Sequence, residues 1–228
     1  AQGIAMPLLY GQNLTAGTII CCVVFILYGL RLGGYLAIRE FGKSSYKKNM
    51  VGEIKDGKTV PFGVKIAIWT SCAVLYVTQI SGVFYRLQNA AADNVFVFIG
   101  AAVMVAGVSL ETAADIQKNN AKKVNPRRFV DTGLYRIVRC PNYLGEMIFW
   151  TGVVISGIGA VTGWQWAVVA VGYIGIIFVM FSGARRLEVR QNKNYGNDPE
   201  YQKYVKTVPI LLPFIPLYSV EKHKWLVA

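Results

Sequence analysis

The sequence is poor in acidic residues and almost lacks histidine. Among 228 residues it has 12 Asp and Glu against 24 Lys and Arg, and its single histidine, His223, lies close to the C-terminus. A catalytic triad with a histidine base therefore has no candidate in the body of the chain. The four cysteines form no CxxC or Cys/His spacing, so we expect no disulfide, no zinc site and no other metal.

Long polar stretches are also scarce, and apolar residues take their place. Hydrophobic residues make up 54% of the chain, charged residues only 16%, and the mean hydropathy is +0.40. Such a composition is typical of a chain surrounded largely by lipid. We predict an all-α, polytopic membrane helix bundle that forms a single domain over residues 1–228. Its five expected transmembrane spans are near the roughly 20 residues needed to cross a bilayer: Leu14–Leu30, Ile66–Leu87, Val95–Leu110, Leu144–Val161 and Trp164–Gly183.

The basic residues are confined to a few segments. Apart from Lys65 and Arg86, every Lys and Arg lies in 31–58, 118–139 or 185–224. These segments follow the first, third and fifth runs, so the positive-inside rule predicts an outer N-terminus and a cytosolic C-terminus. We therefore interpret the net charge of +12 as contact with membrane lipids, in a bacterial inner membrane or an endoplasmic reticulum-type membrane. We do not expect nucleic-acid binding.

Polar residues recur at every fourth position at the predicted cytosolic ends of three spans, and such residues share one helix face. The first polar stripe consists of Arg31, Tyr35 and Arg39. Tyr28 lies about one turn deeper, in the apolar part of the same run. This arrangement places cations near water and a phenol in the membrane.

The second polar stripe consists of Glu111, Asp115 and Asn119. Two carboxylates four residues apart repel each other on an isolated helix, so something must offset that repulsion. One possibility is a ligand with hydroxyl or amide donors. The other is a nearby lysine: Lys118, Lys122 or Lys123.

The third polar stripe consists of Asn142, Glu146 and Trp150 and follows Pro141, which suits the first turn of a helix. A helix N-terminus favours a carboxylate, and that preference alone could explain Glu146. The alternative is that Glu146 faces a cavity and pairs with a donor, as ionisable groups in membrane helices usually do.

A basic loop separates the second and third stripes. Such a cluster suits phosphate groups, although attraction to anionic lipid headgroups explains it as well. Its members are Lys122, Lys123, Arg127, Arg128, Arg136 and Arg139.

Three stretches together resemble the steroid 5α-reductase and sterol reductase superfamily, especially its bacterial members. They are "ETAADIQK" (111–118), "GLYRIVRCPNYLGE" (133–146) and "RRLEV…YGNDPEYQKYVKTVPILLPF" (185–214), and the likeness extends over about 28–214. Isoprenylcysteine carboxyl methyltransferases, which use S-adenosylmethionine, share part of this pattern. Asn142 and Glu146 fit the reductase form of the motif better.

The resemblance implies NADPH as the cofactor and a role for each matching residue. Asn142 and Glu146 would hold the nicotinamide carboxamide, and Tyr28 would donate a proton to the oxygen of an enone. Asp115 and Asn119 match positions at the ribose and adenine. The positions around the phosphates are Arg31, Tyr35, Arg39 and Arg128.

The sequence therefore predicts an NADPH-dependent oxidoreductase that reduces a C=C bond conjugated to a carbonyl in a lipophilic, steroid- or terpenoid-like substrate. Gln79, in the second span, is a candidate substrate contact, although a helix–helix hydrogen bond is the alternative. Two other functions stay open. One is a membrane methyltransferase that uses S-adenosylmethionine; the other is a non-catalytic structural subunit, because the family's amino-terminal glutamate has no equivalent before Tyr28.

Overall fold

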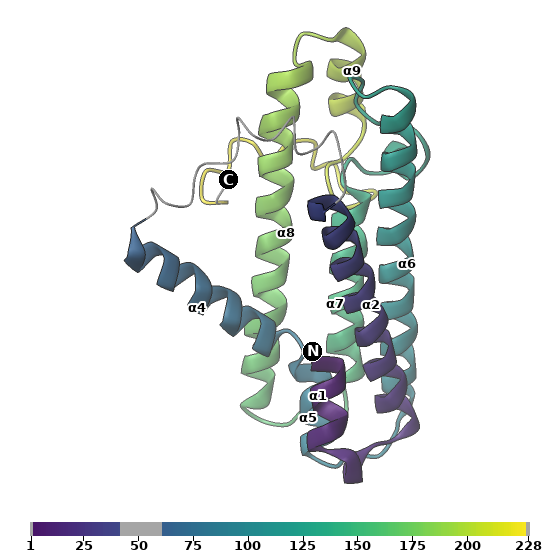
Figure 1. The fold of residues 1–228 in the computed structure, drawn as a ribbon, viewed down its shortest axis with the longest axis vertical. Helices are drawn as coiled ribbons and strands as arrows, with labels where there is room; N and C mark the ends of the chain where they lie inside the picture. Colours follow the sequence, from purple (N-terminus) through teal and green to yellow (C-terminus); the bar gives the residue numbers. More distant parts are fainter. Residues whose placement is uncertain (1, 42–60, 227–228) are drawn as a thin grey trace.

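The computed structural model describes residues 2–41 and 61–226, and these form helices connected by turns (Figure 1). Of the side chains in α2, those of 35, 36 and 38–41 are outside the description. No strand occurs in the described ranges, so the predicted all-α class is confirmed. The elements are α1 (Gln2–Leu9), η1 (Gly11–Asn13), α2 (Ala16–Phe41), α4 (Phe62–Thr78), α5 (Ser81–Gln88), α6 (Val95–Val124), η3 (Gly133–Arg136), α7 (Pro141–Ser156), α8 (Gln165–Tyr195) and α9 (Pro199–Thr207).

Three helices, α2, α6 and α8, are long and apolar enough by length and composition to cross a membrane alone. They correspond to the first, third and fifth predicted spans and indicate an integral membrane protein. The number of spans and their orientation toward the cytosol stay predictions. In Figure 1 the C-terminal ends of α2, α6 and α8 lie at the same end of the bundle as the start of α7. We call this the motif end.

The second predicted span, Ile66–Leu87, is broken in the structure. Its residues form α4 and α5, which meet at an angle of 54°. The Thr78 hydroxyl donates to the carbonyl of Val74 (2.7 Å), and the Ser81 hydroxyl donates to that of Thr78 (2.5 Å). Hydroxyls of this kind satisfy the carbonyls that a break leaves free in an apolar setting. If α4 and α5 together count as one span, the structure offers four.

The fourth predicted span is shorter than expected. It was predicted to run to Val161, but α7 ends at Ser156 after 16 residues. The buried Arg86 side chain donates to the carbonyls of Ser156 (2.9 Å) and Ile158 (3.2 Å), and Gly159 then turns the chain with a φ of 78°. This arginine satisfies carbonyls that the end of a helix leaves unpaired.

Helices α6 and α7 pack closely because glycines face each other. Gly100 of α6 meets Gly152 of α7. Seven residues later in α6, Gly107 meets Gly145, which lies seven residues earlier in α7. A Cβ added to Gly152 would lie 2.5 Å from the Gly100 carbonyl oxygen and 2.6 Å from the Met104 amide nitrogen. Small residues of this kind allow membrane helices to approach at backbone distance. The close approach brings the second and third polar stripes together.

Replacing Gly152 with alanine is expected to destabilise the bundle by about 1–3 kcal/mol, the usual cost of overpacking a core. The added methyl group meets backbone atoms, which cannot rotate away as a side chain can. The measurement is the thermal unfolding midpoint in detergent. Gly29→Ala is the matched control, because Gly29 is also helical and no atom lies within 4 Å of its added Cβ. Equal shifts in both variants would contradict the close packing.

Candidate functional site

The site is built from three helices that present their polar stripes at the motif end. Pro141 is the first residue of α7, so Glu146 lies in the second turn of that helix. Glu111 belongs to α6, and a Cβ added to Gly145 would lie 2.7 Å from the amide nitrogen of Glu111. Tyr28 and Arg31 approach from α2. One or more described members of each predicted stripe therefore meet here: Arg31 of the first, Glu111 and Asp115 of the second, and Glu146 and Trp150 of the third.

Tyr28 and Glu146 are in direct contact across α2 and α7. The phenol of Tyr28 donates to Glu146 Oε1 at 2.5 Å, and the indole N–H of Trp150 donates to the same oxygen at 3.0 Å. The Tyr28 ring stacks on Phe149, with a centroid distance of 4.4 Å. Neither of these two hydrogen bonds uses Glu146 Oε2. One carboxylate oxygen thus positions a phenol in apolar surroundings.

Arg31 lies between the two carboxylates of the second stripe. Its guanidinium group forms ion pairs with Glu111 and Asp115, which offsets the repulsion between them. Of the candidate lysines, Lys122 donates to the Tyr195 hydroxyl at 3.0 Å, whereas Lys118 interacts electrostatically with Asp115. The ion-pair partner of both carboxylates is therefore an arginine from a distant part of the chain, which the sequence did not indicate; a ligand contact stays a prediction. A phosphate at Arg31 would compete with two carboxylates.

One oxygen of this cluster has no partner. Glu111 Oε2 is buried and makes no hydrogen bond within the described part of the chain. An unpaired buried acceptor is costly. It marks a place where a donor on a ligand would be favourable.

A second feature of the motif end is a cavity of about 120 Å³ between α6, the loop that follows it, α7 and α8. Four cationic side chains line it, together with Asn142 of the third stripe. Its volume is below the roughly 300–1,000 Å³ of sites for whole small molecules, so it suits one part of a larger ligand. The lining residues are Lys118, Lys122, Phe129, Val130, Tyr135, Arg139, Asn142, Leu187, Arg190, Gln191, Asn194 and Tyr195.

Arg139 is the most deeply buried cation of this cavity. Its side chain is 2% exposed and donates to Glu188 Oε1 at 2.9 Å. Its Nε and Nη1 have no hydrogen-bond partner within the described ranges. Buried donors of a guanidinium group suit an anion such as a phosphate.

Cys140 follows Arg139 in the motif and is unsuited to acid–base chemistry. Burial raises the pKa of its thiol to about 12, so the thiol stays protonated near neutral pH. Among the described residues, no group of three or more His, Cys, Asp or Glu could hold a metal ion.

Several predicted site residues lie apart from the Tyr28–Glu146 contact. Arg128 is exposed and pairs with Glu200 of α9 and with Asp131; its hydrogen bond to Glu200 raises its pKa. Asn119 is exposed on α6. The side chains of Tyr35 and Arg39 lie outside the described residues.

Gln79 lies at the break between α4 and α5, where it is 8% exposed. Its Oε1 finds no hydrogen-bond donor in the described part of the chain. The amide oxygen therefore makes no helix–helix hydrogen bond there, and that alternative is left to the amide nitrogen. A substrate contact at Gln79 stays a prediction.

Sequence reasoning missed the part of the cavity that α8 contributes. Lys122 and Arg139 were predicted as part of the phosphate-binding loop, but Lys118 was considered only as a counterion, and Arg190 and Asn194 of α8 were not considered. The two lysines, and likewise the two α8 residues, lie at i, i+4 spacing near the ends of helices, the same signal that revealed the three stripes. Applying it to α8 would have added a fourth stripe.

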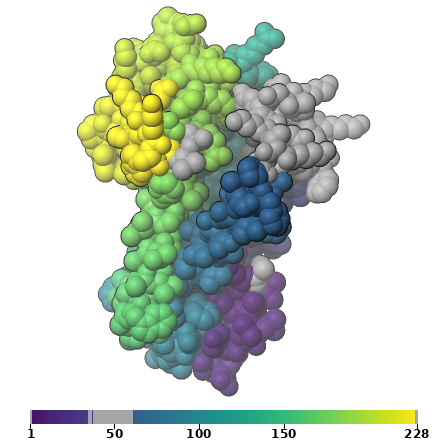
Figure 2. All heavy atoms as spheres, turned by 90° about the vertical axis from the view of Figure 1, so that its left-hand side faces the viewer, coloured from purple at the N-terminus to yellow at the C-terminus, as the bar shows by residue number. Residues whose placement is uncertain are grey.

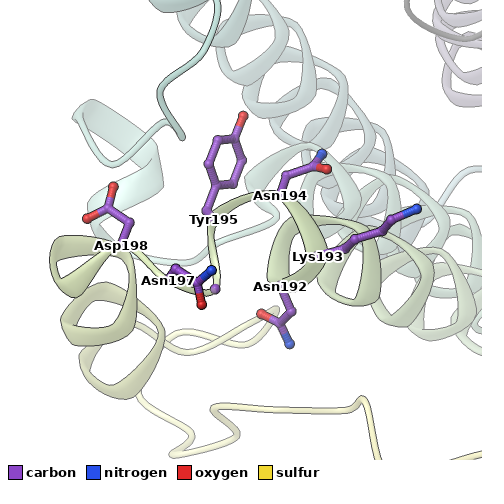
Figure 3. Close-up of a pocket in the computed structure, with 7 residues that line it drawn as sticks. Asn192, Lys193, Asn194, Tyr195, Asn197 and Asp198 are labelled. Carbon is purple, nitrogen blue, oxygen red and sulfur yellow. The ribbon is translucent and has the colours of Figure 1, made fainter.

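A further hollow of about 370 Å³ lies at the turn between α8 and α9 (Figure 3). Its seven lining residues, 192–198, belong to the last turn of α8 and the connection to α9. Tyr195 and Asn192 point to opposite sides of it. The hydroxyl of Tyr195 bonds to Lys122, and the Asn192 amide oxygen accepts from Tyr201 at 2.7 Å. These side chains therefore have structural roles.

The fold and the site define a helical membrane protein with a hydrogen-bonded Tyr–Glu pair beside a basic cavity. The chain belongs to the family described as "Protein of unknown function (DUF1295)", whose model matches residues 3–208. It is also similar to "Steroid 5-alpha-reductase DET2" of Arabidopsis thaliana, with 28% identity over 120 residues. These findings confirm the predicted steroid 5α-reductase-like superfamily.

The match to the plant protein is partial. It covers 51% of this chain and 41% of the length of that relative. No solved structure matches the chain.

Proposed function

We propose that this protein is a membrane oxidoreductase of the CH–CH type that uses NADPH to reduce a C=C bond conjugated to a carbonyl. Its substrate would be lipophilic and steroid- or terpenoid-like, drawn from a bacterial inner membrane or an endoplasmic reticulum-type membrane. The observation that carries the proposal is the contact between Tyr28 and Glu146. This hydrogen bond connects the expected proton donor, Tyr28, with Glu146, the carboxylate expected to hold the nicotinamide carboxamide. The similarity to a plant steroid 5-alpha-reductase supports the same class of reaction.

The motif end offers polar groups suited to both ends of NADPH. Asn142 and Glu146 present an amide and a carboxylate, which match the acceptor and the donor of a carboxamide. Oε1 of Glu146 already accepts from Tyr28 and Trp150, so Oε2 is the oxygen for the carboxamide. The four cationic side chains that line the cavity suit a phosphate.

Bound NADPH would supply the hydride for the β-carbon of the enone. The protein's part is to hold and deliver the proton. Glu146 and the stacked ring of Phe149 fix the Tyr28 phenol within the apolar core cluster. With substrate bound, the single O–H proton would turn from Glu146 Oε1 to the carbonyl oxygen of the substrate and stabilise the negative charge that develops there; a proton from solvent would then restore the phenol. Surrounding apolar side chains exclude water from the reacting atoms.

The cavity favours this function over the methyltransferase alternative. S-adenosylmethionine carries no phosphate, and its single carboxylate is accompanied by a cationic sulfonium group, so it would leave most of the four cations around this cavity of 120 Å³ without an anion. A non-catalytic subunit would not require a buried donor and acceptor pair at a phenol. The experiment below separates all three possibilities.

NADPH is expected to bind at least about tenfold more tightly than NADH, because one additional phosphate gains charge-assisted hydrogen bonds worth about 1.5–3 kcal/mol. Isothermal calorimetry on the detergent-solubilised chain measures both affinities. Lys118→Met, which removes a cation from the cavity, should reduce this preference. Lys203→Met, at an exposed position on α9, should leave it unchanged.

Equal affinity for the two nucleotides would contradict the use of NADPH. Binding of S-adenosylmethionine alone would support the methyltransferase instead. Binding of none of the three would favour a non-catalytic subunit.

A further inference from the structure

The C-terminal segment is attached to the outside of α8 at the motif end. After α9 the chain returns toward the bundle, and Figure 2 shows these residues on the surface beside α8. The Val220 amide donates to Glu188 Oε2 at 2.8 Å. Arg185 donates to the carbonyls of Glu221 and Leu226, each at 3.0 Å. The backbone of this segment is therefore held in place at both ends.

A short exposed stretch of the C-terminal segment is flanked in the sequence by two buried residues. Val220 is 2% exposed and Leu226 is 1% exposed, and both belong to a core cluster with Ala184 of α8. Between them, residues 221–225 are all exposed. We call this stretch, Glu221–Trp225, the C-terminal clip. It is presented outward by its anchors and does not pack into the core.

The clip contains basic and aromatic residues side by side. Lys222 and Lys224 flank His223, and Trp225 follows with 68% of its surface exposed. The single acid, Glu221, accepts a hydrogen bond from the Asn192 amide at 2.7 Å. The acid is thus engaged with α8, and the net charge of the clip is positive.

The position of Trp225 indicates the depth of the clip relative to the membrane. Its ring lies 6.1 Å from the ring of Phe178, an exposed aromatic residue of α8. Phe178 belongs to the stretch 165–184, which has no Asp, Glu, Lys or Arg, and Arg185 is the first charged residue after it. Seven residues of helix cover about 10 Å, so the clip spans the boundary between the apolar and the charged parts of α8.

We propose that the C-terminal clip binds anionic lipid headgroups, with Trp225 in the interfacial layer and the two lysines facing the lipid phosphates. Tryptophan is enriched at this depth because its ring is apolar and its N–H is polar. Basic residues at a membrane surface attract anionic lipids, and each contributes about a fivefold increase in binding. This inference does not depend on the reductase activity.

The test uses the whole chain in nanodiscs that mix a phosphatidylglycerol with a phosphatidylcholine, where one of the two carries brominated acyl chains. Bromine quenches nearby tryptophan emission. The difference between the parent chain and Trp225→Phe isolates the emission of Trp225 among the five tryptophans. Phenylalanine keeps an aromatic ring against Phe178 and so preserves the packing.

Quenching of Trp225 by the brominated anionic lipid is expected to exceed quenching by the brominated zwitterionic lipid, with a local enrichment of about fivefold or more. Lys222→Glu with Lys224→Glu should abolish that preference. Lys203→Glu with Lys206→Glu, at exposed positions of α9, makes the same change in net charge and should preserve it.

Three outcomes would overturn the proposal. Equal quenching by both lipids would make Trp225 an interfacial residue without headgroup recognition. Absence of quenching would place the clip away from the bilayer and free for a protein partner. Equal loss of preference in both double variants would assign the effect to overall charge.

Discussion

Replacing Tyr28 with phenylalanine is expected to lower turnover by about 10²–10⁴-fold, the range for loss of general-acid assistance, while the affinity for NADPH stays nearly unchanged. The variant removes only the hydroxyl that donates to Glu146 Oε1. The aromatic ring remains and keeps its stacking on Phe149. The change therefore tests the proton donor with little effect on packing.

Steady-state assays on an accepted enone, together with calorimetry for NADPH, measure the two quantities separately. The matched control is Tyr173→Phe, because Tyr173 is also packed against the main core cluster and its hydroxyl pairs with Thr151 at 2.9 Å. That control should retain activity within a few-fold. Near-parental turnover in Tyr28→Phe would remove Tyr28 from the mechanism and leave it as a tyrosine packed between helices.

Replacing Glu146 with glutamine is expected to weaken NADPH binding by roughly 10- to 100-fold, because a charge-assisted hydrogen bond worth about 1.5–3 kcal/mol becomes a neutral one. Glutamine keeps an oxygen that accepts from Tyr28 and Trp150, but its amide nitrogen cannot accept from a carboxamide. We expect the unfolding midpoint to change little. Calorimetry and thermal unfolding in detergent measure the two effects.

Glu200→Gln is a suitable control, since Glu200 is an exposed carboxylate whose partner, Arg128, is also exposed. It should leave nucleotide affinity unchanged. The competing explanation for Glu146 is the favourable field at the start of α7. Under that explanation the Glu146→Gln chain would unfold at a lower temperature and still bind NADPH normally per folded molecule.

The convergence of the polar stripes illustrates what local patterns reveal. The spacing of four placed Glu111 with Asp115, and Asn142 with Glu146, on single helix faces. That two residues four apart share a helix face depends only on helical geometry. This prediction therefore holds whichever helices surround the one in question. The order of the apolar runs along the sequence indicated that each stripe lies at the end of a run, and Figure 1 shows these helix ends at one end of the bundle.

The partners across helices could not be predicted in the same way. Arg31 was expected near phosphates, yet it pairs with Glu111 and Asp115, which are 80 and 84 residues away. Arg190 lines the same cavity as Lys118 from a different helix. Such contacts depend on how closely α2, α6 and α8 approach, and that distance is determined by packing over the whole bundle.

The amino-acid sequence by itself determined the class of this protein, its apolar helices and the residues of its motif, because composition and helical periodicity are local properties. Only the tertiary structure decided that α4 and α5 are separated by a bend and that α7 ends at Ser156. Tertiary structure also decided that Tyr28 meets Glu146. Those features arise where a residue such as Arg86 or Gly152 meets atoms of another helix, and no local pattern contains that information.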